Sequence, residues 1–302
     1  MSLAPCFFDQ HRGFAMGIIL SGNGVGGVVL APMVQTLLTR RVGAPWTLRI
    51  LGFMTLVLMT PVALVPRQPP GFEARRRGGP GSTRLNLNLV KRGTFLAQAI
   101  GCFLQAAGNI VPLFYLNSFS TSVLKYSSST GSLLLALNNG INSVARIVMG
   151  ILADRVGRQN TLIVSVLLSS LSVFALWYNA SQARFITFVV FYGILAGGYN
   201  ALLPTTITEV YGVQNYDAVN GSIYFLRGLG AIAGPPIAGV ILGTHSRGIL
   251  SVSGVGVGLG VIKKKYNDLI VYDGVLLVGA SICVAYVRWC DAKEKGIWKW
   301  KA

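Results

Sequence analysis

Acidic residues are scarce in this sequence. Aspartate and glutamate together number 9, against 26 lysines and arginines, and charged residues fill only 12% of the 302 positions. A soluble domain normally carries about 25% charged residues. So few charges, together with 52% hydrophobic residues and a mean hydropathy of +0.59, argue against an ordinary soluble domain and favour an integral membrane protein.

Histidines and paired cysteines are also lacking. The 2 histidines, His11 and His245, lie in opposite end regions, which leaves no basis for a His-based triad or metal site. No cysteine pair has a CxxC or metal-ligand spacing among Cys6, Cys102, Cys283 and Cys290. The glycine-rich run GVGVGLGV at 254–261 is not a dinucleotide fingerprint, because no strand precedes it. We therefore expect no enzymatic activity, no metal and no cofactor.

The net charge of +17 would suggest a nucleic-acid partner in a soluble protein. Here the basic residues gather in short segments between apolar runs: Arg75, Arg76, Arg77, Lys91, Arg92, Lys293, Lys295, Lys299 and Lys301. Cytoplasmic loops of membrane proteins are enriched in lysine and arginine. This rule explains the charge without nucleic acid, so we expect a lipid bilayer as partner and no nucleic acid.

Eight apolar runs are long enough to cross a bilayer as helices. They span about Gly13–Leu38, Trp46–Val65, Gly93–Leu116, Gly131–Ala153, Thr161–Trp177, Phe185–Val210, Asn220–Leu242 and Leu269–Trp289. The sequence therefore predicts an all-α polytopic membrane protein with both termini in the cytoplasm. The first run contains five glycines whose spacing permits close packing against another helix: Gly17, Gly22, Gly24, Gly26 and Gly27. 

Three regions follow from this pattern. Residues 1–65 hold the first two helices, and 66–92, rich in proline, glycine and arginine, form a cytoplasmic linker. Residues 93–302 hold six further helices. The segment 243–267 is atypical, because it carries lysines on the predicted outer side; an insert, a translated intron and a designed loop are the alternatives for it.

Four polar side chains interrupt the fourth run. Asn138, Asn142 and Arg146 are spaced by four and share one helix face, with Asn139 beside them. A guanidinium at membrane depth is costly, so Arg146 is the leading candidate for a substrate contact. The alternative is that Arg146 reaches the interface or bonds to neighbouring carbonyls in a structural role.

Three more polar residues within spans are candidates for substrate binding. Asn109, near Pro112, either lines a cavity or ties helices together by hydrogen bonds, as do Gln98 and Gln105. Asn200 follows two glycines and precedes Pro204, which is typical of a broken helix that opens toward a central site. Arg227 is a second possible anion contact, and its alternative is a structural pairing.

The segment GILADRVGRQ, residues 150–159, resembles the signature loop of the major facilitator superfamily, G-x-L-A-D-R-x-G-R-[KR]. The resemblance implies a cytoplasmic gate built from Gly150, Asp154, Arg155, Gly157 and Arg158. Gly157 permits a tight reversal, and Asp154 can pair with the arginines. Glu209, at the end of its span, is expected to pair with Arg155 or Arg158 in the same gate.

The segment FFDQHRGFAMG, residues 7–17, looks like the monocarboxylate transporter signature, although Gln10 and His11 depart from it. Overall the chain looks most like the fungal members of this group. The resemblance covers spans five to twelve of a twelve-span family, which implies a partial major facilitator fold and an N-terminally truncated transporter.

The resemblance implies secondary transport of a small organic anion, monocarboxylate or polar metabolite by alternating access. The resemblance also implies an Asp-x-x-x-Arg pair on the eighth span of the family. Arg146 matches the arginine of this pair, but Asn142 stands where the aspartate would be. This replacement argues against proton coupling through the pair, because an asparagine carries no titratable proton. A proton remains a possible coupling partner of the protein. The alternatives are efflux of a secondary metabolite and a truncated fragment that transports nothing. We expect the plasma membrane rather than the vacuole or another internal membrane.

Overall fold

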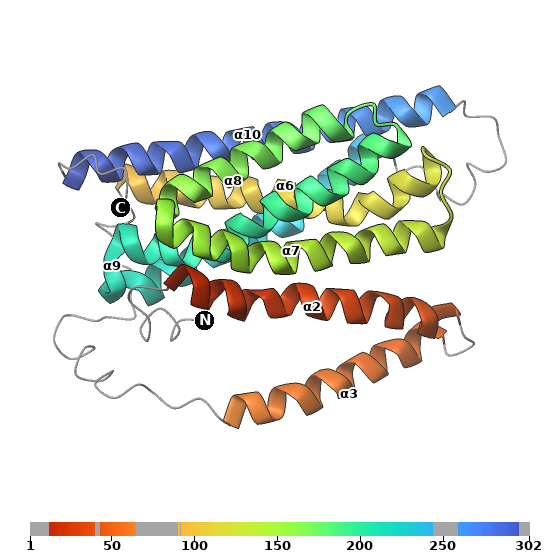
Figure 1. Ribbon diagram of the computed structural model, residues 1–302, viewed down its shortest axis with the longest axis horizontal. Helices are drawn as coiled ribbons and strands as arrows, with labels where there is room; N and C mark the ends of the chain where they lie inside the picture. The colour runs from red at the N-terminus through yellow and green to blue at the C-terminus, as the bar shows by residue number, and fades with distance from the viewer. Residues whose placement is uncertain (1–11, 40–42, 65–89, 91, 244–258, 296–302) are drawn as a thin grey trace.

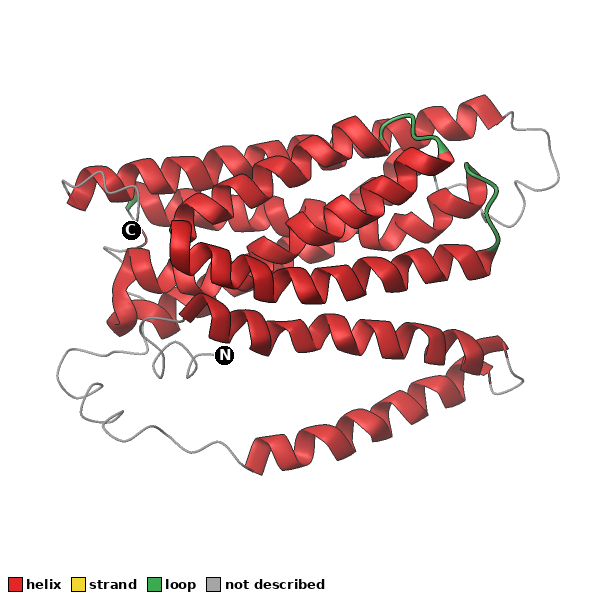
Figure 2. Cartoon of the chain, in the orientation of Figure 1, coloured by secondary structure: helices red, strands yellow, loops and turns green. Residues whose placement is uncertain are grey.

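The computed structural model describes residues 12–39, 43–64, 90, 92–243 and 259–295, and the regular structure in these ranges is helical (Figures 1 and 2). The helices are α2 (Arg12–Thr39), α3 (Gly43–Leu64), α6 (Gly93–Ser122), α7 (Ser128–Val156), α8 (Arg158–Ser172) with the π-helical turn η1 (Val173–Trp177), α9 (Gln182–Leu242) and α10 (Leu259–Lys295). They lie side by side, as membrane-spanning helices do.

Within the described residues, 8 helical segments are long and apolar enough to cross a membrane, which confirms the predicted number of spans. Two of them, Gln182–Gly212 and Asn215–Leu242, belong to α9, which is interrupted at Gly212. Gly212 has a φ of 76°, in the left-handed region that favours glycine. The chain therefore reverses direction there without a long loop.

The last helix begins earlier than the apolar run predicts. The run starts at Leu269, whereas α10 starts at Leu259 and includes Lys263, Lys264 and Lys265. Lysine is a good helix former, so charged turns can extend a helix beyond the apolar part of the bilayer. Of the predicted insert, residues 259–267 belong to α10, Gly243 ends α9, and 244–258 lie outside the described residues. The linker at 66–92 lies largely outside them as well.

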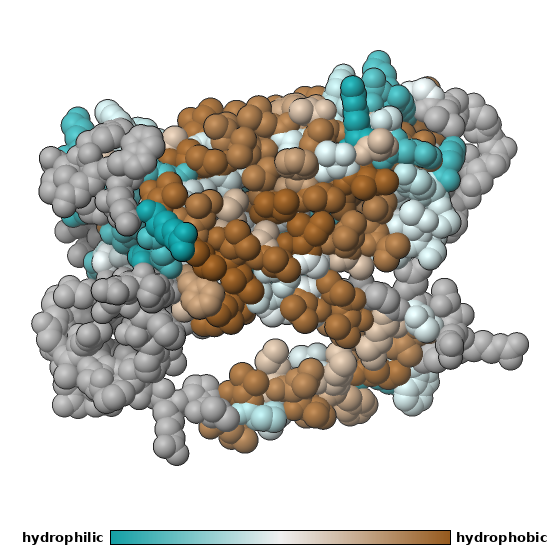
Figure 3. Space-filling view, in the orientation of Figure 1, coloured by the Kyte–Doolittle hydropathy of each residue, from teal (hydrophilic) through white to brown (hydrophobic). Residues whose placement is uncertain are grey.

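Two apolar clusters hold α6 to α10 together. One contains a set of aromatic rings, in which Trp177 stacks on Phe188 and meets Phe119 edge to face. The other gathers around Tyr199, Leu202 and neighbouring residues of α6, α8 and α10. Figure 3 shows hydrophobic side chains over the middle of the bundle and hydrophilic ones towards its ends, the distribution expected of a lipid-embedded surface.

Helix α2 packs closely against α7 through glycines. A Cβ atom on Gly17 would lie 2.6 Å from the carbonyl oxygen of Arg146, and one on Gly24 would lie 2.7 Å from that of Asn139. Gly22 and Gly26 have open space instead. The predicted close packing is therefore confirmed for one face of α2. Helix α3 is different: only 6% of its apolar stretch is buried, and the helix diverges from α2 (Figure 1).

Candidate functional site

A cavity of about 440 Å³ lies between α2, α6, α7 and both halves of α9. Its wall contains all six residues that the sequence singles out as substrate contacts: Asn109, Asn138, Asn142, Arg146, Asn200 and Arg227. These residues come from three helices and are separated by up to 118 positions, counting from 109 to 227. The fold thus brings them to one place, while their role in binding stays a prediction.

The polar residues of α7 form a ladder that joins it to its neighbours. Asn138 Nδ2 donates to the Val189 carbonyl at 2.8 Å, and Asn142 Nδ2 donates to the Gly193 carbonyl at 3.2 Å. Both carbonyls belong to α9. Buried amides are expected to be satisfied in this way inside a membrane, where water cannot compensate. Asn138 and Asn142 therefore have a structural role whether or not they touch a substrate.

Arg146 is 6% exposed and is held at two points. Its Nε donates to Asn142 Oδ1 at 2.9 Å, and its Nη1 donates to the carbonyl oxygen of Leu20 on α2. A guanidinium has five N–H donors. Two of these N–H groups, on Nε and Nη1, have partners among the described residues, so other N–H groups of the guanidinium are available to an anion in the cavity. The structural alternative and the binding role are both compatible with this arrangement.

Arg227 lies on the second half of α9. Its Nη2 donates to Asn200 Oδ1, and its guanidinium carbon lies 5.7 Å from the ring centroid of Tyr199 and 5.6 Å from that of Tyr224. Contacts between a guanidinium and aromatic rings at this distance are attractive and limit the rotamers of the arginine. The Arg227 charge is therefore fixed at the cavity wall without a carboxylate.

The cavity is electropositive. Arg146 and Arg227 both line it and feel each other's charge. No aspartate or glutamate is among the cavity-lining residues in the part of the chain that the structure describes. Like charges that share a low-dielectric site repel one another unless an anion lies between them. The arrangement can therefore bind a carboxylate or another small organic anion.

Among the cavity residues that a reading of the sequence misses are two tyrosines. Tyr224 lies one helical turn before Arg227, and this spacing could have suggested a shared face. Tyr192 lines the cavity and donates its hydroxyl to the Asn109 carbonyl at 3.3 Å. No local pattern marks Tyr192, since aromatic residues are common in apolar spans. Gln98 and Gln105 are buried elsewhere, and Gln98 Nε2 contacts Cys102 Sγ at 3.6 Å.

At one end of the bundle, Asp154 of α7 caps the start of α2. Its carboxylate accepts the backbone N–H groups of Gly13, at 3.2 Å, and Phe14, at 3.1 Å. Arg158 completes the contact with an ion pair of 3.1 Å to Asp154. The first N–H groups of a helix lack partners and carry partial positive charge, so a carboxylate is favoured there. Asp154 thus joins α2, α7 and α8.

The signature loop also reaches α9 and α10. Gln159 Nε2 donates to Glu209 Oε1 at 2.9 Å and to Asp291 Oδ2 at 2.8 Å. The turn between α7 and α8 is a single residue, Gly157, with a φ of 111°. Arg158 forms its ion pair with Asp154, and Arg155 is exposed. The expected pairing of Glu209 with either arginine stays a prediction; Glu209 accepts the hydrogen bond from Gln159.

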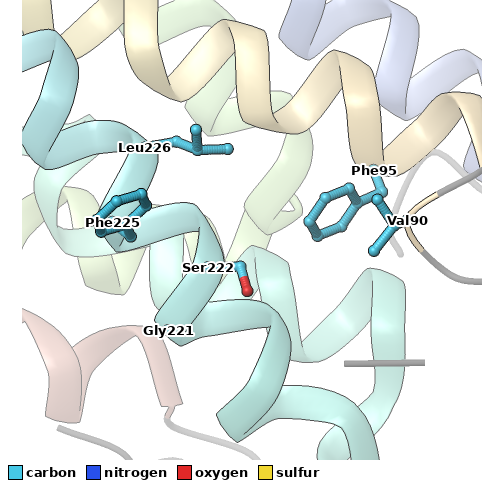
Figure 4. Close-up of a pocket in the computed structure, with 6 residues that line it drawn as sticks. All are labelled: Val90, Phe95, Gly221, Ser222, Phe225 and Leu226. Carbon is cyan, nitrogen blue, oxygen red and sulfur yellow. The ribbon is translucent and has the colours of Figure 1, made fainter. Parts of the chain in front are cut away.

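A second hollow, of about 420 Å³, lies near the start of α6 and is shown in Figure 4. Its lining is almost wholly apolar: Val90, Phe95, Gly221, Ser222, Phe225 and Leu226. It is open and brings no charged side chain, so it gives no recognition chemistry. No group of three metal-ligating side chains occurs within the ranges described above.

Eight apolar segments of membrane-spanning length, five of which border a polar cavity, define an integral, multi-pass membrane protein in the described part of the chain. A family model described as Major Facilitator Superfamily matches residues 2–235 and 122–271. The chain belongs to the Major Facilitator Superfamily, and its all-α structure is part of that fold.

Curated relatives come from fungi. An MFS-type transporter of Aspergillus fumigatus is 29% identical over 296 residues, which cover 93% of this chain and 64% of the relative. The agnestins efflux protein AgnL12 of Paecilomyces divaricatus is 30% identical over 243 residues, covering 80% of this chain and 54% of the relative. The aspyridones efflux protein apdF of Emericella nidulans is 29% identical over 263 residues, covering 83% and 51%. The chain thus spans between 51% and 64% of the length of these relatives.

Proposed function

We propose that this chain supplies the substrate cavity of a secondary active transporter that moves a small organic anion across a membrane by alternating access. Membership of the superfamily supports the transporter class. The cavity among α2, α6, α7 and α9 supports the substrate class. Transport, and not enzymatic conversion, is the proposed activity.

One observation carries the choice of an anion. Two guanidiniums, those of Arg146 and Arg227, line one cavity without an acidic residue among its described lining residues. A substrate carboxylate would offset one of the two positive charges and accept hydrogen bonds from N–H groups of Arg146 that are not used by Asn142 or Leu20. Tyr192 and Tyr224 add aromatic surface to the same wall, which favours an acid with an apolar or aromatic body.

Efflux of an acidic secondary metabolite is the second candidate function. Two relatives carry the names of efflux proteins, for agnestins and for aspyridones. Monocarboxylate-type transport rests instead on the resemblance at residues 7–17 and on Arg146. Both candidates use the same electropositive cavity and differ in direction and in the size of the acid.

The signature loop is proposed as the gate at the cytoplasmic end. Asp154 binds the first N–H groups of α2 while Gln159 binds Glu209 and Asp291, so polar contacts join the helices at this end. These contacts can break and reform, because each is a hydrogen bond between separate helices. Opening would expose the cavity to this side.

The proposal is tested with the purified chain in proteoliposomes. We expect saturable uptake of radiolabelled benzoate and little uptake of neutral benzamide. Hydrogen bonds to charged groups contribute about 1.5–3 kcal/mol, so Arg146→Gln or Arg227→Gln should raise the KM for benzoate about tenfold to a hundredfold. Arg184→Gln, which removes an exposed arginine at the start of α9, is the matched control.

Three outcomes are informative. Benzamide transported as well as benzoate, with no effect of either cavity substitution, would contradict the anion site. A correctly inserted chain that moves neither probe would favour the alternative of a fragment without transport activity. Loss of transport in the Arg184 control would show that the cavity arginines have no special role.

A further inference from the structure

The last helix carries a carboxyl group inside the apolar core. Asp273 of α10 is 0% exposed, and it shares a helix face with Leu269, Ile270 and Leu277, which are exposed by at most 1%. Neither oxygen of Asp273 has a hydrogen-bond partner among the described residues. Polar groups buried in this way normally have partners, so the exception calls for a chemical explanation.

Asp273 lies directly behind the wall of the central cavity. A Cβ atom added to Gly108 of α6 would lie 3.2 Å from Asp273 Oδ1, so the carboxyl group packs against a stretch of α6 that lacks a side chain. The next residue, Asn109, lines the cavity, and its carbonyl accepts the Tyr192 hydroxyl. Tyr192 lines the cavity and also lies close enough to Asp273 to interact with it, so the carboxyl group lies near the cavity.

No cation neutralises this carboxyl group in the part of the chain that is described. The titratable groups that interact with it are Tyr192 on α9 and Tyr272 on its own helix, and both are neutral phenols at physiological pH. On α6 it meets Gly108, and the neighbouring Gly274 packs against Phe174 of η1. Arg146 and Arg227 line the cavity that Tyr192 also borders.

An ionised carboxylate without partners in such a core costs several kcal/mol, even after relaxation of its surroundings. A neutral carboxylic acid avoids most of this cost, since only its hydroxyl and carbonyl remain unpaired. The packing of α6, α9 and α10 therefore requires a proton on the group.

We propose that Asp273 is a proton-binding site whose occupancy is linked to the packing of α10 against α6. The carboxyl group holds its proton in the packed arrangement. When α6 and α10 separate and water enters from the cavity, the O–H bond breaks, its electron pair stays on the carboxylate oxygen, and a water molecule takes the proton. By linkage, a step of the proposed transport cycle that hydrates Asp273 releases a proton, and this coupling rests on the proposed function.

Infrared spectroscopy of the purified chain in nanodiscs tests the protonation itself. At neutral pH the wild type should show the carbonyl band of a protonated carboxylic acid, which shifts on exchange into D₂O. Asp273→Asn, which preserves shape and neutrality, should abolish the band, whereas Asp268→Asn at an exposed position of the same helix should retain it. An unchanged band in Asp273→Asn, or no band in the wild type, would overturn the proposal.

A second measurement covers the case in which the asparagine variant does not fold. Asp273→Glu keeps the acid in a slightly different position and should shift the frequency of the same band; an identical frequency would assign the band to another residue and overturn the proposal.

Hydrogen exchange tests the link to packing. On moving from neutral to alkaline pH, and after correction for intrinsic exchange, protection of the amides of α6 and α10 should fall about tenfold more in the wild type than in Asp273→Asn. Equal losses would contradict the linkage. Neither readout needs a substrate, so failure of the transport assay and failure of the proton site are distinguishable.

Discussion

At the scale of the residue, Arg146 and Asn142 set the charge of the cavity together. Asn142 uses its oxygen for Arg146 Nε and its amide for the Gly193 carbonyl, so both ends of the side chain have partners. An amide orients the guanidinium but leaves its full charge available to an anion. An aspartate at this position would keep the contact with Arg146 Nε and neutralise its charge, but it could not donate to the Gly193 carbonyl.

We therefore expect Asn142→Asp to weaken anion binding. An internal ion pair would compete with the substrate carboxylate, and the Kd for benzoate should rise about tenfold, equivalent to about 1.4 kcal/mol. Equilibrium dialysis of the purified protein measures this. Asn267→Asp adds the same charge in the first third of α10, at a residue that does not line the cavity and accepts the Asn179 N–H, and should leave the Kd unchanged. Equal or tighter binding in Asn142→Asp would contradict the account.

The sequence predicts these residues better than it predicts their surroundings. The spacing of four places Asn138, Asn142 and Arg146 on one helix face, and the structure confirms that shared face. Tyr192 could not be assigned to the cavity in the same way, because its position depends on how α9 packs against α6 and α7; for Tyr224 the spacing to Arg227 is the one available signal. A polar residue in a span is conspicuous, whereas a tyrosine is not.

At the scale of the element, glycines decide how closely α2 approaches α7. Gly17 lies against the backbone of Arg146, so a larger side chain there would separate the two helices and pull the Leu20 carbonyl away from the guanidinium. Gly22 on the same helix has nothing within 4 Å. The glycine content of this span thus has a structural cause on one face only.

Gly17→Val should destabilise the protein by about 1–3 kcal/mol, the usual cost of overpacking. Thermal denaturation in detergent should show a lower Tm for Gly17→Val, and a Tm close to the wild-type value for Gly22→Val. If both variants lowered the Tm equally, the effect would come from helix propensity and not from the contact with α7.

The contact between Asp154 and α2 gives a second prediction at this scale. Asp154→Asn removes the negative charge that meets the first N–H groups of α2 and the Arg158 ion pair. Amide exchange in the first turn of α2 should accelerate about tenfold or more, since a hydrogen bond to a charged group contributes about 1.5–3 kcal/mol. Mass spectrometry of hydrogen exchange measures it, with Asp217→Asn at an exposed site as control. Unchanged exchange at Gly13 and Phe14 would show that the carboxylate does not hold this end.

At the scale of the whole molecule, the number and approximate position of the spans follow from hydropathy alone. Eight apolar runs predict the eight membrane-length segments. The basic segments between α7 and α8 and at the end of α10 predict that these helix ends lie on the same side of the bundle. The early start of α10 depends on helix propensity, and the reversal at Gly212 depends on backbone geometry. Hydropathy reports neither property. The position of Arg146 and Arg227 in one cavity depends on how α7 packs against α9 and could not be predicted from spacing.

The central claim is that this cavity binds an organic anion through two arginines, and equilibrium binding of radiolabelled benzoate to the purified chain tests it most directly. We predict saturable binding to the wild type, none of comparable affinity for benzamide, and loss of benzoate binding by about a hundredfold or more in the doubly substituted Arg146→Gln, Arg227→Gln protein. Benzoate binding that survives in a correctly folded double variant would contradict the claim.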